Sequence, residues 1–238
     1  MSQPADTSIQ NIPLDLLALA FIPVFAVVII LFKWSHHYKY SVYAVSRMLA
    51  QLMLIGYVLN YIFASNSSLL MLSIILLMIT VSSSIALNHI KHKTPSHYKI
   101  TFLSILLPGG LTFFLITQLV LQLDPWYLPN YFIPIAGMIF ANAMTSVSLA
   151  AERFDSEYGR SQVYLEARNT AFKAAMIPQH NALLAVGLVS LPGMMTGQIL
   201  SGVSPLIAAR YQIMVMCMIY GSAGLAAAMY LYLNRKHY

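Results

Sequence analysis

Long apolar stretches recur along the chain, and shorter polar stretches separate them. A helix that crosses a hydrocarbon layer of about 30 Å needs roughly 20 mostly apolar residues. The pattern predicts seven such segments, which are 14–32, 42–63, 68–87, 100–122, 131–151, 174–193 and 206–233. We therefore expect an all-α integral membrane protein with about seven transmembrane helices, organised as one domain over residues 1–238.

The composition agrees with a membrane-embedded chain. The protein has 238 residues, of which 59% are hydrophobic and 8% are charged. Soluble domains carry about 25% charged residues, so soluble globular and disordered classes are excluded. The net charge of +6 fits cytoplasmic loops at a bilayer better than nucleic-acid binding. The single cysteine, Cys217, rules out an intrachain disulfide.

The basic residues gather at alternate ends of the predicted segments. With seven crossings one face receives Lys33, Lys39, Lys91, Lys93, Lys99, Arg153, Arg160, Arg168, Lys173, Arg235 and Lys236. Excess Lys and Arg mark the cytoplasmic side of a membrane protein. This distribution predicts an N-terminus outside and a C-terminus in the cytoplasm.

The acidic residues are absent from the middle of every predicted span. They are Asp6, Asp15, Asp124, Glu152, Asp155, Glu157 and Glu166. Ion-coupled transporters and cation channels commonly place carboxylates within the membrane, so this pattern disfavours both classes. No G-x-x-x-x-G-K-[ST] phosphate loop and no G-x-S-x-G nucleophile elbow occurs. We expect no catalytic residue, no cofactor in this chain, and an energy source in a partner if transport runs uphill.

The stretch "AERFDSEYGRSQVYLEARNTAFKAAMIP" (151–178) is the most charged part of the chain. It forms a cytoplasmic loop over about 152–173, in which the good helix formers of "SQVYLEARNTAFKAA" (161–175) predict a helix along the cytoplasmic surface. Two interpretations stay open, a solvated connector and a docking element for a cytoplasmic partner. Pro178 is expected to break or kink the helix that follows.

The stretch "GLVSLPGMMTGQILSG" (187–202) concentrates residues that weaken a helix. Pro192 and Gly193 predict a break in the sixth helix, which a membrane tolerates only inside protein or beside a wet cavity. One interpretation is a translocation path or gate; the other is a kinked helix and a tight outer turn. The candidate path residues are Pro192, Gly193, Met194, Met195, Thr196, Gly197 and Gln198.

Sulfur and amide side chains add two further candidate features. The pair Met194 and Met195 raises a soft-metal interpretation, although methionine in such a chain is more often core filler. The metal ligands, if any, are unknown. The intramembrane polar candidates are Arg47, Gln51, Asn142 and Asn181. Arg47 suits an interfacial anchor, or a contact at a dimer interface or in the translocation path, and Asn142 suits a polar clamp between packed helices.

Four motifs in order resemble the iron-export permease family of ABC transporters, which includes FetB-type bacterial proteins and plant aluminium-tolerance permeases. They are "IPIAGMIFANAM" (133–144), "AAMIP" (174–178), "VGLVSLPGMMTGQILSG" (186–202) and "AARYQIMV" (208–215). The resemblance covers about 40–233 and is dense from 133 onward. Two departures stand out: the 151–178 loop is shorter and lacks a Gly-Ala-Thr-Pro tetrapeptide, and Ala141 replaces an expected glycine.

The resemblance implies a permease subunit in the bacterial inner (plasma) membrane, exporting a metal, with iron as the family's ion. It implies a homodimer that pairs with a separate P-loop ATPase subunit, on which ATP and Mg²⁺ would bind. The coupling residues implied for that partner are Glu152, Arg153, Tyr164, Glu166, Arg168 and Lys173. The alternatives are an ATP-independent secondary transporter or channel, and a membrane scaffold that transports nothing.

Overall fold

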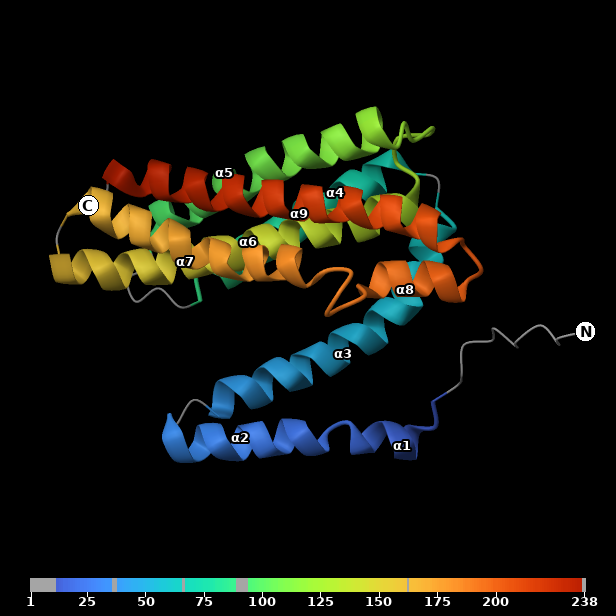
Figure 1. Ribbon diagram of the computed structural model, residues 1–238, viewed down its shortest axis with the longest axis horizontal. Coiled ribbons are helices and arrows are strands. Elements are labelled where there is room, and N and C mark those ends of the chain that lie inside the picture. Colours follow the sequence, from blue (N-terminus) through green and yellow to red (C-terminus); the bar gives the residue numbers. More distant parts are fainter. Residues whose placement is uncertain (1–11, 36–37, 66, 89–93, 162, 237–238) are drawn as a thin grey trace, which may run out of the picture. The chain divides into compact units, whose positions relative to one another are not determined.

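The computed structural model describes residues 12–35, 38–65, 67–88, 94–161 and 163–236. Within these ranges every regular element is a helix, as the hydrophobic pattern predicts (Figure 1). The chain divides into two compact units, Met1–Ser65 and Asn66–Tyr238, and each is described here by itself. The single domain expected from the sequence stays a prediction. Lys91 and Lys93, used in the orientation argument, lie outside the described residues.

The first unit contains two short helices and one long one. Its helices are α1 (Leu14–Leu19), α2 (Ile22–Trp34) and α3 (Tyr38–Phe63). The first predicted segment is therefore interrupted, since a turn at residues 20–21 separates α1 from α2. A proline in the first turn of α2 suits a helix start, because the missing N–H would be unpaired there. The ring of Phe32 meets the edge of Tyr38 at 5.0 Å, joining α2 to α3.

The second unit is a bundle of long helices. Its elements are α4 (Ser68–Ala86), α5 (Pro95–Phe114), η1 (Leu115–Val120), α6 (Pro129–Ser161), α7 (Tyr164–Ala185), α8 (Gly193–Leu200), α9 (Pro205–Leu233) and η2 (Asn234–Lys236). Thr94 and Ser204 cap α5 and α9 with their side chains, and each is followed by a proline at the helix start. These caps explain why both helices begin where they do.

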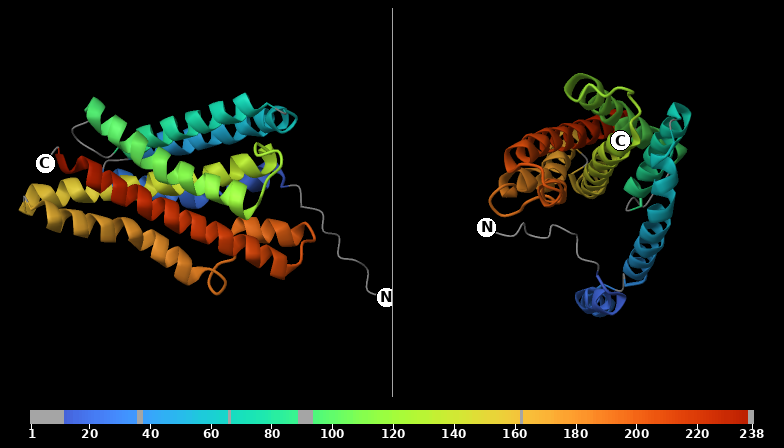
Figure 2. Two further views of the ribbon diagram at one scale, coloured as in Figure 1. Left: turned by 90° about the horizontal axis from the view of Figure 1, so that it is seen from above. Right: turned by 90° about the vertical axis from the view of Figure 1, so that its right-hand side faces the viewer.

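The core of the second unit lies around α6, which packs against α4, α5, α7 and α9. Small residues on α6 and α9 are fully buried, among them Ala143, Ala150, Ala223 and Ala227. Small side chains let helices approach closely where lipid supplies no hydrophobic driving force. Figure 2 shows α9 in red running along α5 and α7 over most of its length.

Six helical stretches in the described residues are long and apolar enough to cross a membrane. They are Leu14–Trp34, Tyr38–Phe63, Ser68–Ala86, Pro95–Val120, Pro129–Arg160 and Pro205–Leu233. The predicted segment 174–193 is not among them, because its residues are shared between α7, a loop and the start of α8. Six of the seven predicted segments therefore coincide with a candidate span, and the count of seven stays a prediction.

The helix expected from residues 161–175 is present from Tyr164 onward, but it is the first part of the long helix α7 and not a separate surface helix. α6 continues ten residues past the predicted span to Ser161, and α7 begins at Tyr164, so the stretch forms the ends of two antiparallel helices. Favourable helix formers on both sides of the turn allow each long helix to extend instead of ending at the membrane. We call residues 152–161 and 163–173 the hairpin tip.

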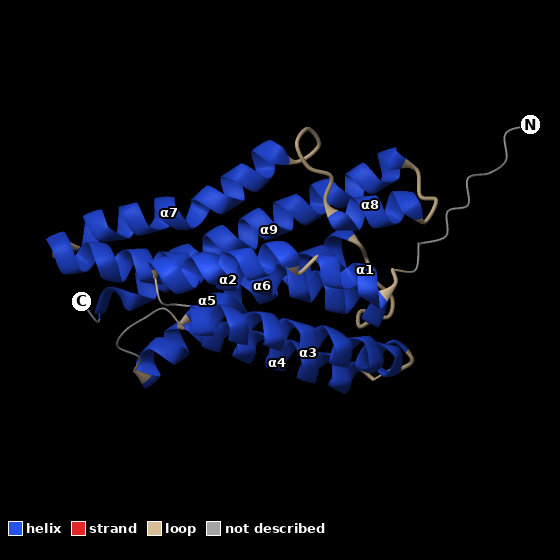
Figure 3. Cartoon of the chain, turned by 90° about the horizontal axis from the view of Figure 1, so that it is seen from below, coloured by secondary structure: helices blue, strands red, loops and turns tan. Residues whose placement is uncertain are grey.

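The break in the sixth predicted segment lies earlier than expected. α7 passes through Pro178 and ends at Ala185, and residues 186–192 form a loop that Figure 3 shows in tan before α8. Pro192 stands at the N-cap of α8, so it starts a helix where an interruption was predicted. The loop closes through Gly187, whose N–H donates to the Ser190 carbonyl at 2.9 Å. Gly187 has φ +87°, a conformation that costs glycine little and other residues more.

Candidate functional site

The hairpin tip lies at the same end of the second unit as the end of α9 (Figures 1 and 2). Tyr164 joins these parts, because its hydroxyl donates a hydrogen bond of 2.8 Å to the Leu231 carbonyl. Its ring meets the edge of Phe154 on α6 at 5.7 Å, and the Arg168 guanidinium lies 5.9 Å from the ring centre. Tyr164 therefore connects α6, α7 and α9 through one side chain.

The protonation of Tyr164 suits this role. Burial raises the pKa of its hydroxyl above the ordinary value, although the nearby Arg168 and Arg235 guanidiniums lower it. The hydroxyl thus keeps its proton at physiological pH and remains a donor to Leu231.

The charged coupling candidates separate into two groups on the hairpin tip. Glu152, Arg153, Glu166 and Lys173 are exposed, whereas Arg168 is half-buried and donates to the Asn169 amide oxygen. Arg153 pairs with Glu157 at 2.8 Å, a partly exposed pair that contributes about 0–1 kcal/mol. Within the described chain, Glu152, Glu166 and Lys173 form no ion pair, so their charges face outward.

The predicted path residues lie together on α8 and its N-cap. The Thr196 hydroxyl donates to the Pro192 carbonyl at 3.2 Å and so secures the first turn of α8. A methyl group added at Gly193 or Gly197 would meet nothing within 4 Å, so neither glycine is needed there for close packing. Met194 and Met195 are both half-buried. The Gln198 side-chain oxygen is buried without a hydrogen-bond partner in the described chain.

A cavity of about 360 Å³ lies between α7, α8 and α9, and we call it the α7–α9 cavity. Of the predicted path residues it contains Met195 alone. Most of its wall comes from one face of α9, with Ala209, Gln212, Ile213, Met216 and Cys217 at helical spacing, and the end of α7 completes it. These α9 residues were not predicted, although their i, i+3, i+4, i+7, i+8 spacing would have placed them on one face.

A buried polar pair within the bundle was also missed. Gln179 on α7 is 5% exposed, and its amide donates to the Ser146 hydroxyl of α6 at 3.3 Å. The pair links these helices inside the apolar core. Its sequence signal is weak, because a single glutamine directly after Pro178 would fit a helix end equally well.

The other polar candidates do not converge on one site. The Asn142 amide donates to the Met138 carbonyl of its own helix at 2.8 Å, and among the described residues it has no hydrogen bond to another helix, so the clamp stays a prediction. That bond satisfies one of the two amide N–H donors within the helix. Asn181 is exposed on α7, and Arg47 and Gln51 belong to α3 in the first unit.

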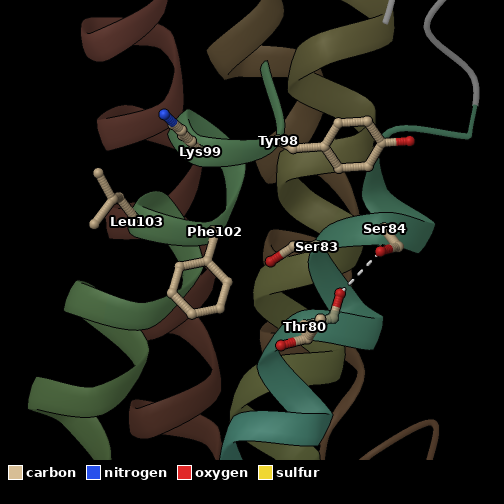
Figure 4. Close-up of a pocket in the computed structure, with 7 residues that line it drawn as sticks. All are labelled: Thr80, Ser83, Ser84, Tyr98, Lys99, Phe102 and Leu103. Atoms are coloured by element: carbon tan, nitrogen blue, oxygen red, sulfur yellow. Dashed lines mark hydrogen bonds between the residues drawn. The ribbon is translucent and has the colours of Figure 1, made fainter. Parts of the chain in front are cut away.

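A second cavity, of about 410 Å³, lies between α4 and α5 (Figure 4). The hydroxyls of Thr80, Ser83 and Ser84 along its wall donate to carbonyls of their own helix at 2.7–3.0 Å. Lys99 points away from these hydroxyls in Figure 4. The polar groups therefore do not converge on a common ligand position. In the described residues no three His, Cys, Asp or Glu side chains come together to hold a metal.

Comparison with known proteins supplies the family. The model of a family described as an uncharacterised protein family, UPF0014, matches residues 13–168 and 158–238. The probable iron export permease protein FetB of Escherichia coli is 34% identical over 96% of this chain and 93% of its own length. The protein ALUMINUM SENSITIVE 3 of Arabidopsis thaliana is 33% identical over 81% of this chain and 74% of its own length. No solved structure matches the chain.

A UPF0014 membrane protein of Synechocystis is also 33% identical, over 74% of each chain. These matches confirm the resemblance to iron-export permeases that four motifs predicted. Together with the six apolar helices they establish a multi-pass membrane protein. The chain therefore belongs to the UPF0014 family.

Proposed function

We propose that this chain is the membrane-spanning permease subunit of an ABC transporter that exports a metal ion. A separate P-loop ATPase subunit would bind ATP and Mg²⁺ and supply the energy. The name of the Escherichia coli relative, a probable iron export permease, makes iron the first ion to consider.

The observation that carries the proposal is the connection of the hairpin tip to α9. Exposed charges on the tip offer a docking surface to a cytoplasmic protein. Tyr164 ties that surface to the end of α9, and the other half of α9 lines the α7–α9 cavity. Helices are stiff over this length, so a push on the tip would shift the wall of the cavity. That is the mechanical link which alternating access requires.

The same proposal includes the topology and the assembly. α7 and α8 together would form the crossing that neither completes alone, since the two helices follow one another along α9 (Figure 3). This gives seven crossings, with the N-terminus outside and the C-terminus in the cytoplasm. The chain would act as a homodimer in a bacterial inner membrane.

The deciding experiment is recovery of the partner. The tagged chain is extracted from its native membranes in mild detergent, and the proteins bound to it are identified. We expect a P-loop ATPase in about equal amount, with ATP turnover that depends on the permease. A well-folded chain that brings down no ATPase would refute the proposal and favour an ATP-independent transporter or a scaffold.

A further inference from the structure

Three sulfur-bearing side chains meet at the α7–α9 cavity. Met195 comes from α8, while Met216 and Cys217 come from α9, about twenty residues later in the chain. Only the pairing of α8 with α9 brings them to one cavity. Methionine has a flexible side chain and a polarisable sulfur, so both thioethers can move toward an object smaller than the cavity.

A buried polar side chain lines the same cavity. Gln212 lines the cavity one turn before Met216 and is 5% exposed. Its Oε1 atom has no hydrogen-bond partner among the described residues. A buried acceptor without a partner costs free energy, so its retention points to a ligand that engages it.

The charge of the lining restricts the ligand. Among the described residues that line the cavity there is no Asp, Glu, Lys, Arg or His. A hard divalent cation prefers anionic oxygen ligands and would bring two uncompensated charges into an apolar space. Thioether and thiolate sulfurs instead select soft ions such as Cu(I). When a monovalent cation binds the Cys217 sulfur, the metal–sulfur bond replaces the S–H bond, the proton leaves to solvent, and the site stays neutral.

We propose that the α7–α9 cavity binds a soft monovalent cation of the Cu(I) and Ag(I) class. The ligands are the sulfur atoms of Met195, Met216 and Cys217, with the Gln212 Oε1 atom beside them. The proposal that the cavity binds such an ion depends on these residues alone. That the bound ion is also carried across the membrane rests on the proposed function.

Affinity for Cu(I) is the first test. The purified full chain in detergent competes with a coloured Cu(I) chelator under reducing conditions. We expect one ion per chain, with one proton released for each ion bound. Met195→Leu and Met216→Leu should each weaken binding at least about tenfold. Mutation of a group that only contacts a metal ligand already commonly causes a loss of this size. Met214→Leu and Met229→Leu, on the same helix as Met216 but outside the cavity, should leave the affinity unchanged.

Thiol protection gives an independent measurement. Cys217 is the sole cysteine of the chain and is exposed, so a maleimide reports on that one sulfur. Ag(I) should protect it in the unaltered chain, and the Met195→Leu, Met216→Leu double variant should need at least about tenfold more Ag(I). Equal protection in both proteins would mean that a lone thiol binds the metal, and would overturn the proposal. Competition by Mn²⁺ at similar concentration would overturn it as well.

The two proposals fail separately. If Cu(I) binds as expected but no ATPase copurifies, the site stands and the transporter assignment falls. If the ATPase copurifies but neither methionine variant changes Cu(I) affinity, the transporter assignment stands and the soft-cation site falls.

Discussion

At the scale of single residues, Tyr164 shows how one side chain can link a predicted docking surface to the membrane helices. The sequence argument counted it as one of six coupling candidates without distinguishing it from the others. Its hydrogen bond to Leu231 spans 67 positions in sequence, so no local pattern could reveal it. The exposed candidates Glu152, Glu166 and Lys173 are suited to contact a partner, whereas Tyr164 is suited to transmit the contact.

Tyr164→Phe tests this connection. The variant removes the hydroxyl but keeps the ring against Phe154, so we expect a loss of about 1 kcal/mol in the free energy of unfolding. For a chain of this size, that corresponds to a Tm lower by about 2–4 °C in detergent. Tyr131→Phe is the control, since Tyr131 is exposed and its hydroxyl has no hydrogen bond to another described residue.

The pH dependence of that difference has a definite sign. In the folded chain the pKa of Tyr164 is raised above its ordinary value of 10.0, so the folded state binds this proton more tightly than the unfolded state does. The stabilisation from the protonated hydroxyl is therefore complete below about pH 10. It is lost as pH rises through the raised folded pKa. The gap in Tm between the two proteins should therefore be constant from about pH 6 to pH 9. A gap that vanished within that range would contradict the assigned donor.

At the scale of elements, the turns before and after α8 depend on two glycines outside the helices. Gly187 and Gly202 both have φ +87°, one before α8 and one after it. Sequence reasoning recognised that this stretch breaks a helix but attributed the break to Pro192. The structure places Pro192 at a helix start, and the turns on either side of α8 use the positive-φ backbone that glycine permits.

Gly187→Ala and Gly202→Ala should each destabilise the protein by about 1–2 kcal/mol, the cost of a left-handed conformation for a residue with a Cβ atom. Thermal unfolding in detergent measures the effect. Gly221→Ala on α9 is the matched control, because its added methyl group would meet nothing within 4 Å and its φ is helical. Equal unfolding temperatures for all three variants would show that neither turn requires glycine.

At the scale of the whole molecule, the two ends of α6 are suited to different surroundings. α6 has 33 residues and therefore extends about 50 Å, farther than the hydrocarbon layer is thick. Its first residues follow the Trp126 loop, and its last turns carry the charges of the hairpin tip. A partner at the tip can therefore bind outside the hydrocarbon layer while the same helix packs in the transmembrane core.

Charge reversal at the tip tests the partner surface. Glu152→Lys combined with Glu166→Lys should lower the amount of copurified ATPase at least about fivefold, which corresponds to about 1 kcal/mol of binding free energy. Asp124→Lys, an exposed acid in the loop before α6, should leave recovery unchanged. Equal recovery from both variants would place the ATPase contact elsewhere on the cytoplasmic face.

The sequence by itself determined the class, the membrane location and most of the spans, because a bilayer demands a long apolar run for each crossing helix. It also determined the family, since four motifs can be recognised by their residues and their order along the chain, without knowing how they are arranged in space. Tertiary structure decided which residues share a site. Three of these contacts join different helices. Met195 lines one cavity with Met216 and Cys217, Tyr164 donates a hydrogen bond to Leu231, and Gln179 donates one to Ser146. Such contacts depend on the rotation and register of helices packed against one another, and a pattern read along one helix at a time contains neither.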